Sequence, residues 1–326
     1  MAPRRSAWLV PLCLATLYTV WGSTYLAQRV ALAGFAPLRM AALRFLIAGA
    51  VLYVPLRLAG APAPTRAEWR AVVASTLPLT VTGMGVAALA LRQVPSGLAA
   101  LLFGSVPLWA SVFDRLWGGR LSRGEAAGLA LGFAGVALVS LRGGLGGDPL
   151  GAALVLVAAA SYSFGSVATR RLAIPAGALG TAAQMLLGGA VLLAVSVAVG
   201  EPPSMPAPRA LFAMGYLVVF GSIVSYTAYG YVLRHARPSL STSHAFVNPI
   251  VALALGAWLG GERFTRVDLA GLALVLGAVA LVARSRPRPA ASTPANASSV
   301  SSSSSSPQRP LADSSASPWA PVGRSS

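Results

Sequence analysis

A set of aromatic, basic and amide side chains lies inside long apolar stretches of the sequence, where a side chain that faces lipid should be apolar. Aromatic walls with a few hydroxyl and amide groups suit a small amphipathic solute, which stacks on the rings and forms a few hydrogen bonds. Packing between helices or anchoring at the membrane interface is the alternative for each single residue. The candidate substrate-binding residues are Trp21, Tyr25, Arg44, Trp109, Tyr162, Tyr226, Tyr229, His244 and Asn248.

Arg44 is the charged member of this set and lies several residues inside its apolar stretch. An arginine in hydrocarbon costs at least about 2.5 kcal/mol, so its position needs an explanation. The guanidinium either reaches the interface along its aliphatic stem or binds an anionic group of a substrate with its planar fork. The counterpart in the second half of the chain is Gln184, so the charge is one-sided. A structural or gating role is favoured over direct substrate contact.

Two prolines interrupt corresponding apolar stretches in the two halves of the chain. Pro107 and Pro249 each remove a backbone donor and free a carbonyl one turn back, which bends the helix or binds a ligand. Paired interruptions of this kind point to the central site of a transporter, and a packing kink without a ligand is the alternative. Both prolines are therefore predicted to be helix-kink or gating residues.

The acidic residues and histidines do not form a catalytic or metal-binding pattern. The acids lie near the ends of the apolar stretches and do not pair inside one, so general acid–base catalysis has no candidate pair. Cys13 is the single cysteine, and His235 and His244 do not follow zinc-ligand spacing. No catalytic residue, metal or cofactor is expected, and the chain is not predicted to be an enzyme. His244 is more typical of a hydrogen-bonded interior residue than of a proton relay.

Composition indicates the class of protein that carries these residues. The 326 residues are 56% hydrophobic and 10% charged, whereas a soluble domain has about 25% charged residues. All 25 basic residues are arginines, and they cluster between the apolar stretches as topology signals do, so no nucleic-acid partner is expected. More of them lie on the side of the N-terminus, which predicts that both termini are cytoplasmic in a bacterial inner membrane.

Runs of about 20 mostly apolar residues, the length needed to cross a bilayer, predict an all-α membrane protein with ten transmembrane helices. The connections between these runs are short, so no room is left for an extramembrane domain. The predicted helices are roughly 8–28, 38–59, 71–91, 96–116, 124–142, 149–170, 177–199, 210–233, 239–259 and 265–284.

The two halves of the chain resemble each other. Ala126 to Leu138 and Leu269 to Leu281 match at eight of thirteen positions, which indicates a duplication of five helices. An odd number of helices per repeat places the copies upside down relative to one another, an arrangement that secondary transporters use. The predicted domains are a first repeat over 7–142, a second repeat over 149–284 and a disordered Ser/Pro/Ala-rich tail over 285–326.

Several short motifs also resemble the EamA-type transporters of the drug/metabolite transporter superfamily. The first half carries Trp21-Gly22-Ser23-Thr24-Tyr25 and Gly118-Gly119-Arg120, and the second carries Asn248-Pro249 and Gly260-Gly261-Glu262. The resemblance implies ten-helix carriers of amino acids, other metabolites or drugs that work by alternating access. Family members often have a glutamate where this chain has Arg120, so Glu262 lacks a first-half equivalent and is not assigned a transport role.

The predicted function is secondary transport, with export of small organic metabolites or drugs as the favoured direction. An intramembrane lipid-modifying enzyme and a passive channel are the alternatives, and both lack their characteristic residues. Membrane lipids and a small-molecule substrate are the expected partners. The spacing of Gly128 and Gly132 permits a homodimer, although packing within one chain is the more economical explanation.

Overall fold

The computed structural model describes residues 8–116, 118, 122–141, 148–203, 206–235 and 243–285. These ranges are all helices and short connections, with no strand among them. They belong to one compact unit, so the two predicted halves are packed together. The predicted tail over 285–326 lies outside the described residues, apart from Ser285 at the end of the last helix.

In the first half, three rods are built from consecutive pieces of helix, some of them π-helical (η). The elements are α1 (Leu9–Thr16), η2 (Leu17–Trp21), α2 (Gly22–Ala31), α3 (Pro37–Leu58), α4 (Arg66–Thr76), η3 (Leu77–Gly85), α5 (Val86–Ala90), α6 (Ser96–Phe103), α7 (Val106–Leu116) and α8 (Arg123–Leu141).

The second half follows the same order with fewer breaks. Its elements are α9 (Pro149–Thr169), α10 (Ala178–Ala198), α11 (Pro208–Tyr216), η5 (Leu217–Val224), α12 (Ser225–His235), α14 (His244–Trp258) and α15 (Arg266–Ser285). The π-helical segments η3 and η5 occupy the same place in the two halves, inside α4–η3–α5 and α11–η5–α12, the third membrane helix predicted for each half. Such segments are rare and frequently mark functional sites.

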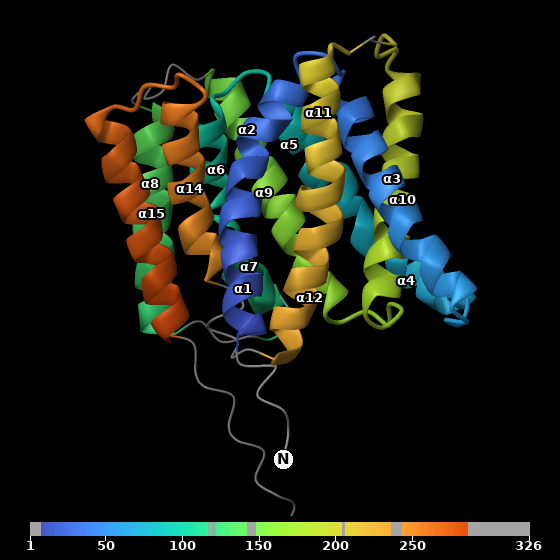
Figure 1. Cartoon of the computed structure of the whole chain (residues 1–326). Helices are drawn as coiled ribbons and strands as arrows, with labels where there is room; N and C mark the ends of the chain where they lie inside the picture. Colours follow the sequence, from blue (N-terminus) through green and yellow to red (C-terminus); the bar gives the residue numbers. More distant parts are fainter. Residues whose placement is uncertain are drawn as a thin grey trace, which may run out of the picture. The chain divides into compact units, whose positions relative to one another are not determined.

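Seven helical stretches are long and apolar enough to cross a membrane, by length and composition. They are Leu9–Ala31, Pro37–Leu58, Arg66–Ala90, Ser96–Leu116, Pro149–Thr169, Ala178–Ala198 and Pro208–Val232. The all-helical class is therefore confirmed, with seven such stretches where the sequence predicted ten. The other three predictions correspond to α8, α14 and α15, which stand beside the seven in Figure 1.

The helices that correspond between the halves run antiparallel. A Cβ at Gly128 of α8 would meet Val282 of α15, whereas a Cβ at Gly135 would meet Leu274. Residue numbers therefore fall along α15 as they rise along α8. The glycines allow these two backbones to approach closely within one chain.

The second helices of the two halves show the same relation. A Cβ at Gly49 of α3 would meet Leu186 of α10, and one at Gly189 of α10 would meet Leu46 of α3. The side chain of Glu201, which follows the end of α10, also bonds the first turn of α3. The start of one helix thus lies against the end of its counterpart.

The helices α3 and α10 end with the same backbone turn. Gly60 and Gly200 have positive φ angles of 88° and 72°, a conformation that glycine adopts without strain. Each donates its N–H to the carbonyl three residues back, and the next residues, Ala61 and Glu201, donate to the carbonyl five residues back. This is a Schellman-type ending. Ala61 and Glu201 are therefore structural counterparts.

The halves interlock through their first helices. The rod α1–η2–α2 packs against α11, α12 and α14 of the second half, and α9 packs against η3, α5, α6 and α7 of the first. The pattern is unchanged when the two halves are exchanged, as a two-fold relation requires. Each half thus contributes walls to the space between them.

Candidate functional site

A cavity of about 140 Å³ lies between the two halves. Its walls come from η2, α2, α3, η3, α5, α6, α7, α9, α12 and α14, whereas no residue of α8 or α15 reaches it. A cavity of roughly 150 Å³ holds a molecule of benzene size. The predicted residues that line this cavity are Trp21, Tyr25, Arg44, Pro107, Tyr162, Tyr226, His244, Asn248 and Pro249.

Aromatic rings form one wall of the cavity. The ring of Trp21 lies 5.7 Å from that of Tyr226 and 4.9 Å from that of His244, each centroid to centroid and edge to face. Tyr229 is not among the lining residues. Its ring packs behind this wall, 5.3 Å from Trp21 and 5.5 Å from His244. Tyr229 can therefore position the wall without contacting a solute.

Trp109 lies outside the cavity, contrary to its predicted place in the wall. Trp109 follows Pro107, which lines the cavity, by two positions, and two positions along a helix turn a side chain by about 200°. The Trp109 ring instead packs 5.0 Å from that of Phe133 on α8, and its buried Nε1 has no hydrogen-bond acceptor among the residues that the structure describes. Trp109 therefore lies on the side of α7 away from the cavity, and its contact with a substrate stays a prediction.

Both prolines line the cavity, but they occupy different positions in their helices. Pro249 lies inside α14, as predicted, whereas Pro107 is the second residue of α7 and follows the turn at Gly104 and Ser105. A Cβ at Gly104 would lie 3.2 Å from Cγ of Pro249, so the two interruptions are in contact. They line the same cavity from opposite halves.

Arg44 is held inside the bundle and does not reach the interface. It is 4% exposed, its Nε donates to Oγ of Ser222 at 2.9 Å, and its Nη2 donates to the carbonyl of Gly221 at 3.2 Å. Both acceptors belong to η5. A Cβ on Gly221 would lie 3.2 Å from Nη2, so the glycine makes room for the guanidinium. Among the described residues Arg44 forms no ion pair with a carboxylate.

The counterpart of Arg44 has a different environment. Gln184 on α10 is buried and donates to Oγ of Ser75 at 2.8 Å and to Oγ1 of Thr169 at 3.3 Å. It is absent from the residues that line the cavity. The cavity is therefore asymmetric in charge, with one guanidinium from the first half.

Amide groups add acceptors to the same cavity. Oδ1 of Asn248 is buried and accepts no hydrogen bond in the described part of the chain. Gln28, which is also buried and lines the cavity, donates through Nε2 to the carbonyl of Thr24 at 3.2 Å. The cavity thus presents a cation on α3 and an open carbonyl acceptor on α14.

A cluster that the sequence did not predict lies around Glu262, at the end of the bundle where α14 is connected to α15. Its carboxylate accepts from Ser96 N at 2.8 Å, from Ser96 Oγ at 2.7 Å and from Gly97 N at 3.0 Å. Arg29 completes the cluster with an ion pair. The Glu262 side chain is only 3% exposed, against 44% for that of Arg29.

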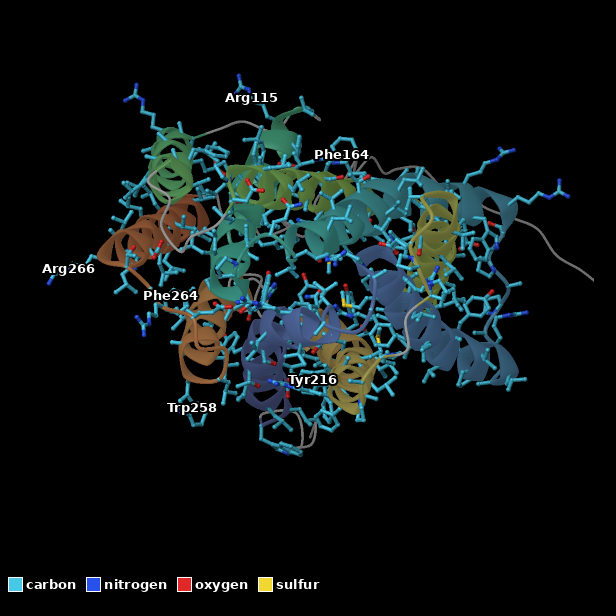
Figure 2. All side chains as sticks on the ribbon, turned by 90° about the horizontal axis from the view of Figure 1, so that it is seen from above. Arg115, Phe164, Tyr216, Trp258, Phe264 and Arg266 are labelled. Carbon is cyan, nitrogen blue, oxygen red and sulfur yellow. The ribbon has the colours of Figure 1, made fainter. Side chains whose placement is uncertain are left out.

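Two glycines make the space for this carboxylate. A Cβ at Gly256 would lie 2.5 Å from Oε2 of Glu262, and one at Gly97 would lie 3.2 Å from the same atom. Burial by itself raises the pKa of Glu262, but the hydrogen bonds from Ser96, Gly97 and Arg29 outweigh it and hold the pKa below its ordinary value. Figure 2 shows Phe264, from the same connection, lying between α14 and α6.

Glu201 forms a second cluster of this kind, in the connection that follows α10. Its carboxylate accepts from Leu38 N at 3.0 Å, from Arg39 N at 2.9 Å and from Ser196 Oγ at 2.7 Å. Its carbonyl accepts from Nη2 of Arg39 at 2.7 Å. Negative charge at a helix N-terminus is stabilised by the free N–H groups and the helix dipole. Both clusters therefore join second-half connections to the starts of first-half helices.

Comparisons with known proteins agree with this architecture. The model of the EamA-like transporter family matches twice, over residues 8–141 and 149–284. The chain is 40% identical to the uncharacterized inner membrane transporter YedA of Escherichia coli over 278 residues, which cover 84% of this chain and 91% of the relative. It is 29% identical to the uncharacterized transporter YvbV of Bacillus subtilis, over 83% of this chain and 90% of the relative.

A solved structure supports the fold. A crystal structure with 23% sequence identity covers 83% of this chain and 95% of its own, with a TM-score of 0.61. This likeness concerns the fold alone, whereas the double match of the family model spans nearly all the described residues. The chain therefore belongs to the EamA-like transporter family.

Proposed function

We propose that this chain is a secondary transporter that moves small organic solutes, such as amino acids, other metabolites or drugs, by alternating access. We propose further that α8, α14 and α15 also cross the membrane, which gives ten transmembrane helices in two inverted repeats. Both termini then lie in the cytoplasm of a bacterial cell, and export across the inner membrane is the favoured direction. Membership of a transporter family supports the coarser part of this proposal.

The single observation that carries the proposal is one cavity built from both halves, whose corresponding helices run antiparallel. Inverted repeats of this kind place the binding site near the middle of the membrane, at their interface. Exchanging the conformations of the two halves then turns the cavity from one side of the membrane to the other.

The polar groups of the cavity suggest what the solute carries. Arg44 has donors left after its bonds to Ser222 and Gly221, and a guanidinium pairs best with a carboxylate or phosphate. The open acceptor Oδ1 of Asn248 requires a donor, such as an amino group. A small molecule with both groups and an apolar side chain would satisfy Arg44, Asn248 and the aromatic wall together.

An efflux assay tests this function. Proteoliposomes with the purified protein are loaded with amino acids, nucleosides or amphipathic drugs, and efflux is measured with and without a pH gradient. We expect efflux of at least one amphipathic solute, and we expect Arg44→Gln to reduce it for anionic or zwitterionic solutes. Lack of efflux for the whole panel in both conditions would count against the proposal.

A matched control separates the cavity from general loss of arginine. Arg115 is exposed at the end of α7 and points away from the bundle in Figure 2. Arg115→Gln should leave efflux within about twofold of the unchanged protein, since isolated surface substitutions have small effects. Equal losses for Arg44→Gln and Arg115→Gln would reject a role of Arg44 in the cavity.

A further inference from the structure

The described residues at the two ends of the bundle form different polar contacts. We call the end with the α2–α3, α10–α11 and α14–α15 connections the outer end, and the end with the α3–α4 connection the inner end; these lie at the top and bottom of Figure 1. Glu201 and Glu262, with their donors, are both at the outer end.

We propose that Glu201 and Glu262 form an outer latch, and that the protein rests with its outer end closed because Ala61 and Arg120, which correspond to them at the inner end, have no acceptor side chain. This inference rests on the proposed alternating-access function and extends it by assigning a resting conformation and the residues that set it. In the proposed orientation, the outer end faces away from the cytoplasm.

The latch joins elements that must separate when the outer end opens. Glu201 holds the first turn of α3, and Glu262 holds the first turn of α6. Arg44 on α3 and Phe103 on α6 line the cavity, so both helices are walls of the site. Opening the cavity outward moves these walls away from the second-half connections and breaks the bonds to both carboxylates.

The symmetry of the fold predicts which contacts the inner end would need in order to match the outer latch. When inverted repeats exchange conformations, contacts made at one end are replaced by corresponding contacts at the other. The structural counterpart of Glu201 is Ala61, whose methyl group accepts no hydrogen bond. By symmetry, a carboxylate at position 61 would accept hydrogen bonds from the first turn of α10. The N-cap of α10, Gly177, provides no side-chain cap.

The sequence counterpart of Glu262 is also unable to act as an acceptor. The motif Gly260-Gly261-Glu262 corresponds to Gly118-Gly119-Arg120. Arg120 lies outside the described residues, but its guanidinium carries donors only. Neither carboxylate of the outer latch is therefore repeated in the first half.

The inner end does have an ion pair, and its setting differs. Arg171, close to the position that corresponds to Arg29, donates to Asp114 at 2.7 Å. The two side chains are 41% and 53% exposed, whereas that of Glu262 is 3% exposed. Exposed pairs are screened by water and salt and contribute little. Of these two ion pairs, the one at the outer end therefore has the more buried carboxylate.

The accessibility of one introduced cysteine measures the balance between the state open to the outer side and the state open to the inner side. Ala87→Cys places a thiol in the cavity wall on α5, in a Cys13→Ser background. Labelling by a membrane-impermeant maleimide is compared between intact cells and inside-out vesicles. The double variant Glu201→Gln/Glu262→Gln keeps the side-chain shapes and removes both charges.

We expect the double variant to raise labelling from the outer side by roughly 5- to 150-fold, the usual range for coupling between two states, and to lower labelling from the inner side. Single variants should show intermediate changes. If the purified double variant keeps its thermal unfolding midpoint and its labelling from the outer side stays the same, the outer latch is rejected.

A gain-of-contact variant covers the case in which the double variant does not fold. Ala61→Glu supplies the missing carboxylate at the inner end, opposite the start of α10, and Ala61→Gln is the matched uncharged control. We expect Ala61→Glu to raise labelling from the outer side above that of Ala61→Gln. Equal labelling of the two would contradict the assigned asymmetry.

The same preparations separate this inference from the proposed function. Unchanged labelling together with solute efflux in proteoliposomes rejects the latch and leaves the transporter function in place. Shifted labelling without efflux of any solute supports the latch as a conformational device and rejects the proposed function.

Discussion

Two ion pairs at opposite ends of the bundle use arginines in similar places but have opposite surroundings. Arg29 meets a carboxylate that is 3% exposed and accepts from Ser96 and Gly97 as well. Arg171 meets Asp114, which is 53% exposed. This comparison predicts that the charge pair itself does not decide how much such a contact stabilises its end of the bundle. Burial and the number of additional donors decide it.

The largest effect is expected from removing the buried carboxylate. Glu262→Ala leaves the N–H groups of Ser96 and Gly97 without an acceptor, which costs about 1–3 kcal/mol for each buried group. We expect a clearly lower thermal unfolding midpoint in detergent and higher labelling of Ala87→Cys from the outer side. Glu262→Gln should lie between Glu262→Ala and the unchanged protein, and an inverted order would contradict the role of the carboxylate.

A smaller effect is expected from filling the space beside the carboxylate. A Cβ at Gly256 would lie 2.5 Å from Oε2 of Glu262, so Gly256→Ala displaces the carboxylate. Overpacking of this kind costs about 1–3 kcal/mol, measured as a shift of the unfolding midpoint. Gly215→Ala is the control, because a Cβ there meets nothing within 4 Å. Equal shifts for the two variants would show that the space around Glu262 is not restricted.

A still smaller effect is expected at the inner end. Asp114→Asn removes an exposed ion pair and should cost about 0–1 kcal/mol. Labelling of Ala87→Cys from the inner side should rise, but by less than labelling from the outer side rises in Glu262→Gln. The difference between Asp114→Asn and the unchanged protein should disappear at about 1 M salt, where exposed charges are screened. A salt-independent change as large as that of Glu262→Gln would show that the inner pair is the stronger one.

The smallest effect is expected from mild acidification. Because the folded-state pKa of Glu262 is below its ordinary value, its stabilising contribution is complete above the unfolded pKa of roughly 4.3 and is lost as pH falls through the folded pKa. Maleimide reacts with the thiolate, so labelling of Ala87→Cys from the outer side is expressed relative to that of the unfolded protein at the same pH, and this ratio should stay constant between about pH 7 and about pH 5. A rise within this window that Glu262→Gln abolishes would contradict the low pKa.

The sequence predicted the local features well because they depend on neighbouring residues. Apolar runs gave the helices, and the spacing of Trp21 and Tyr25 gave one face of the first rod, which does line the cavity. Trp109 does not line the cavity, because it lies two positions after Pro107 and therefore on the opposite side of α7.

The contacts that close the outer end could not be predicted, because they join residues far apart in the sequence. Glu262 bonds Ser96 across 166 positions, and Glu201 bonds Arg39 across 162. A lone glutamate after a glycine pair looks like any solvated loop residue. The comparison of the repeats was the available signal, because Ala61 and Arg120 stand where the second half has Glu201 and Glu262. This comparison indicates an asymmetry between the halves but does not identify the groups that donate to the two carboxylates.

The origin of both outer carboxylates in the second half has a consequence for biosynthesis. Translation delivers the first repeat to the membrane before Glu201 and Glu262 have left the ribosome, and chains fold from the N-terminal side as they emerge. The starts of α3 and α6 are therefore uncapped in the nascent chain. The contacts of the outer end are completed only when the connection between α14 and α15 has been inserted, so they report that all helices of the second repeat before α15 have arrived.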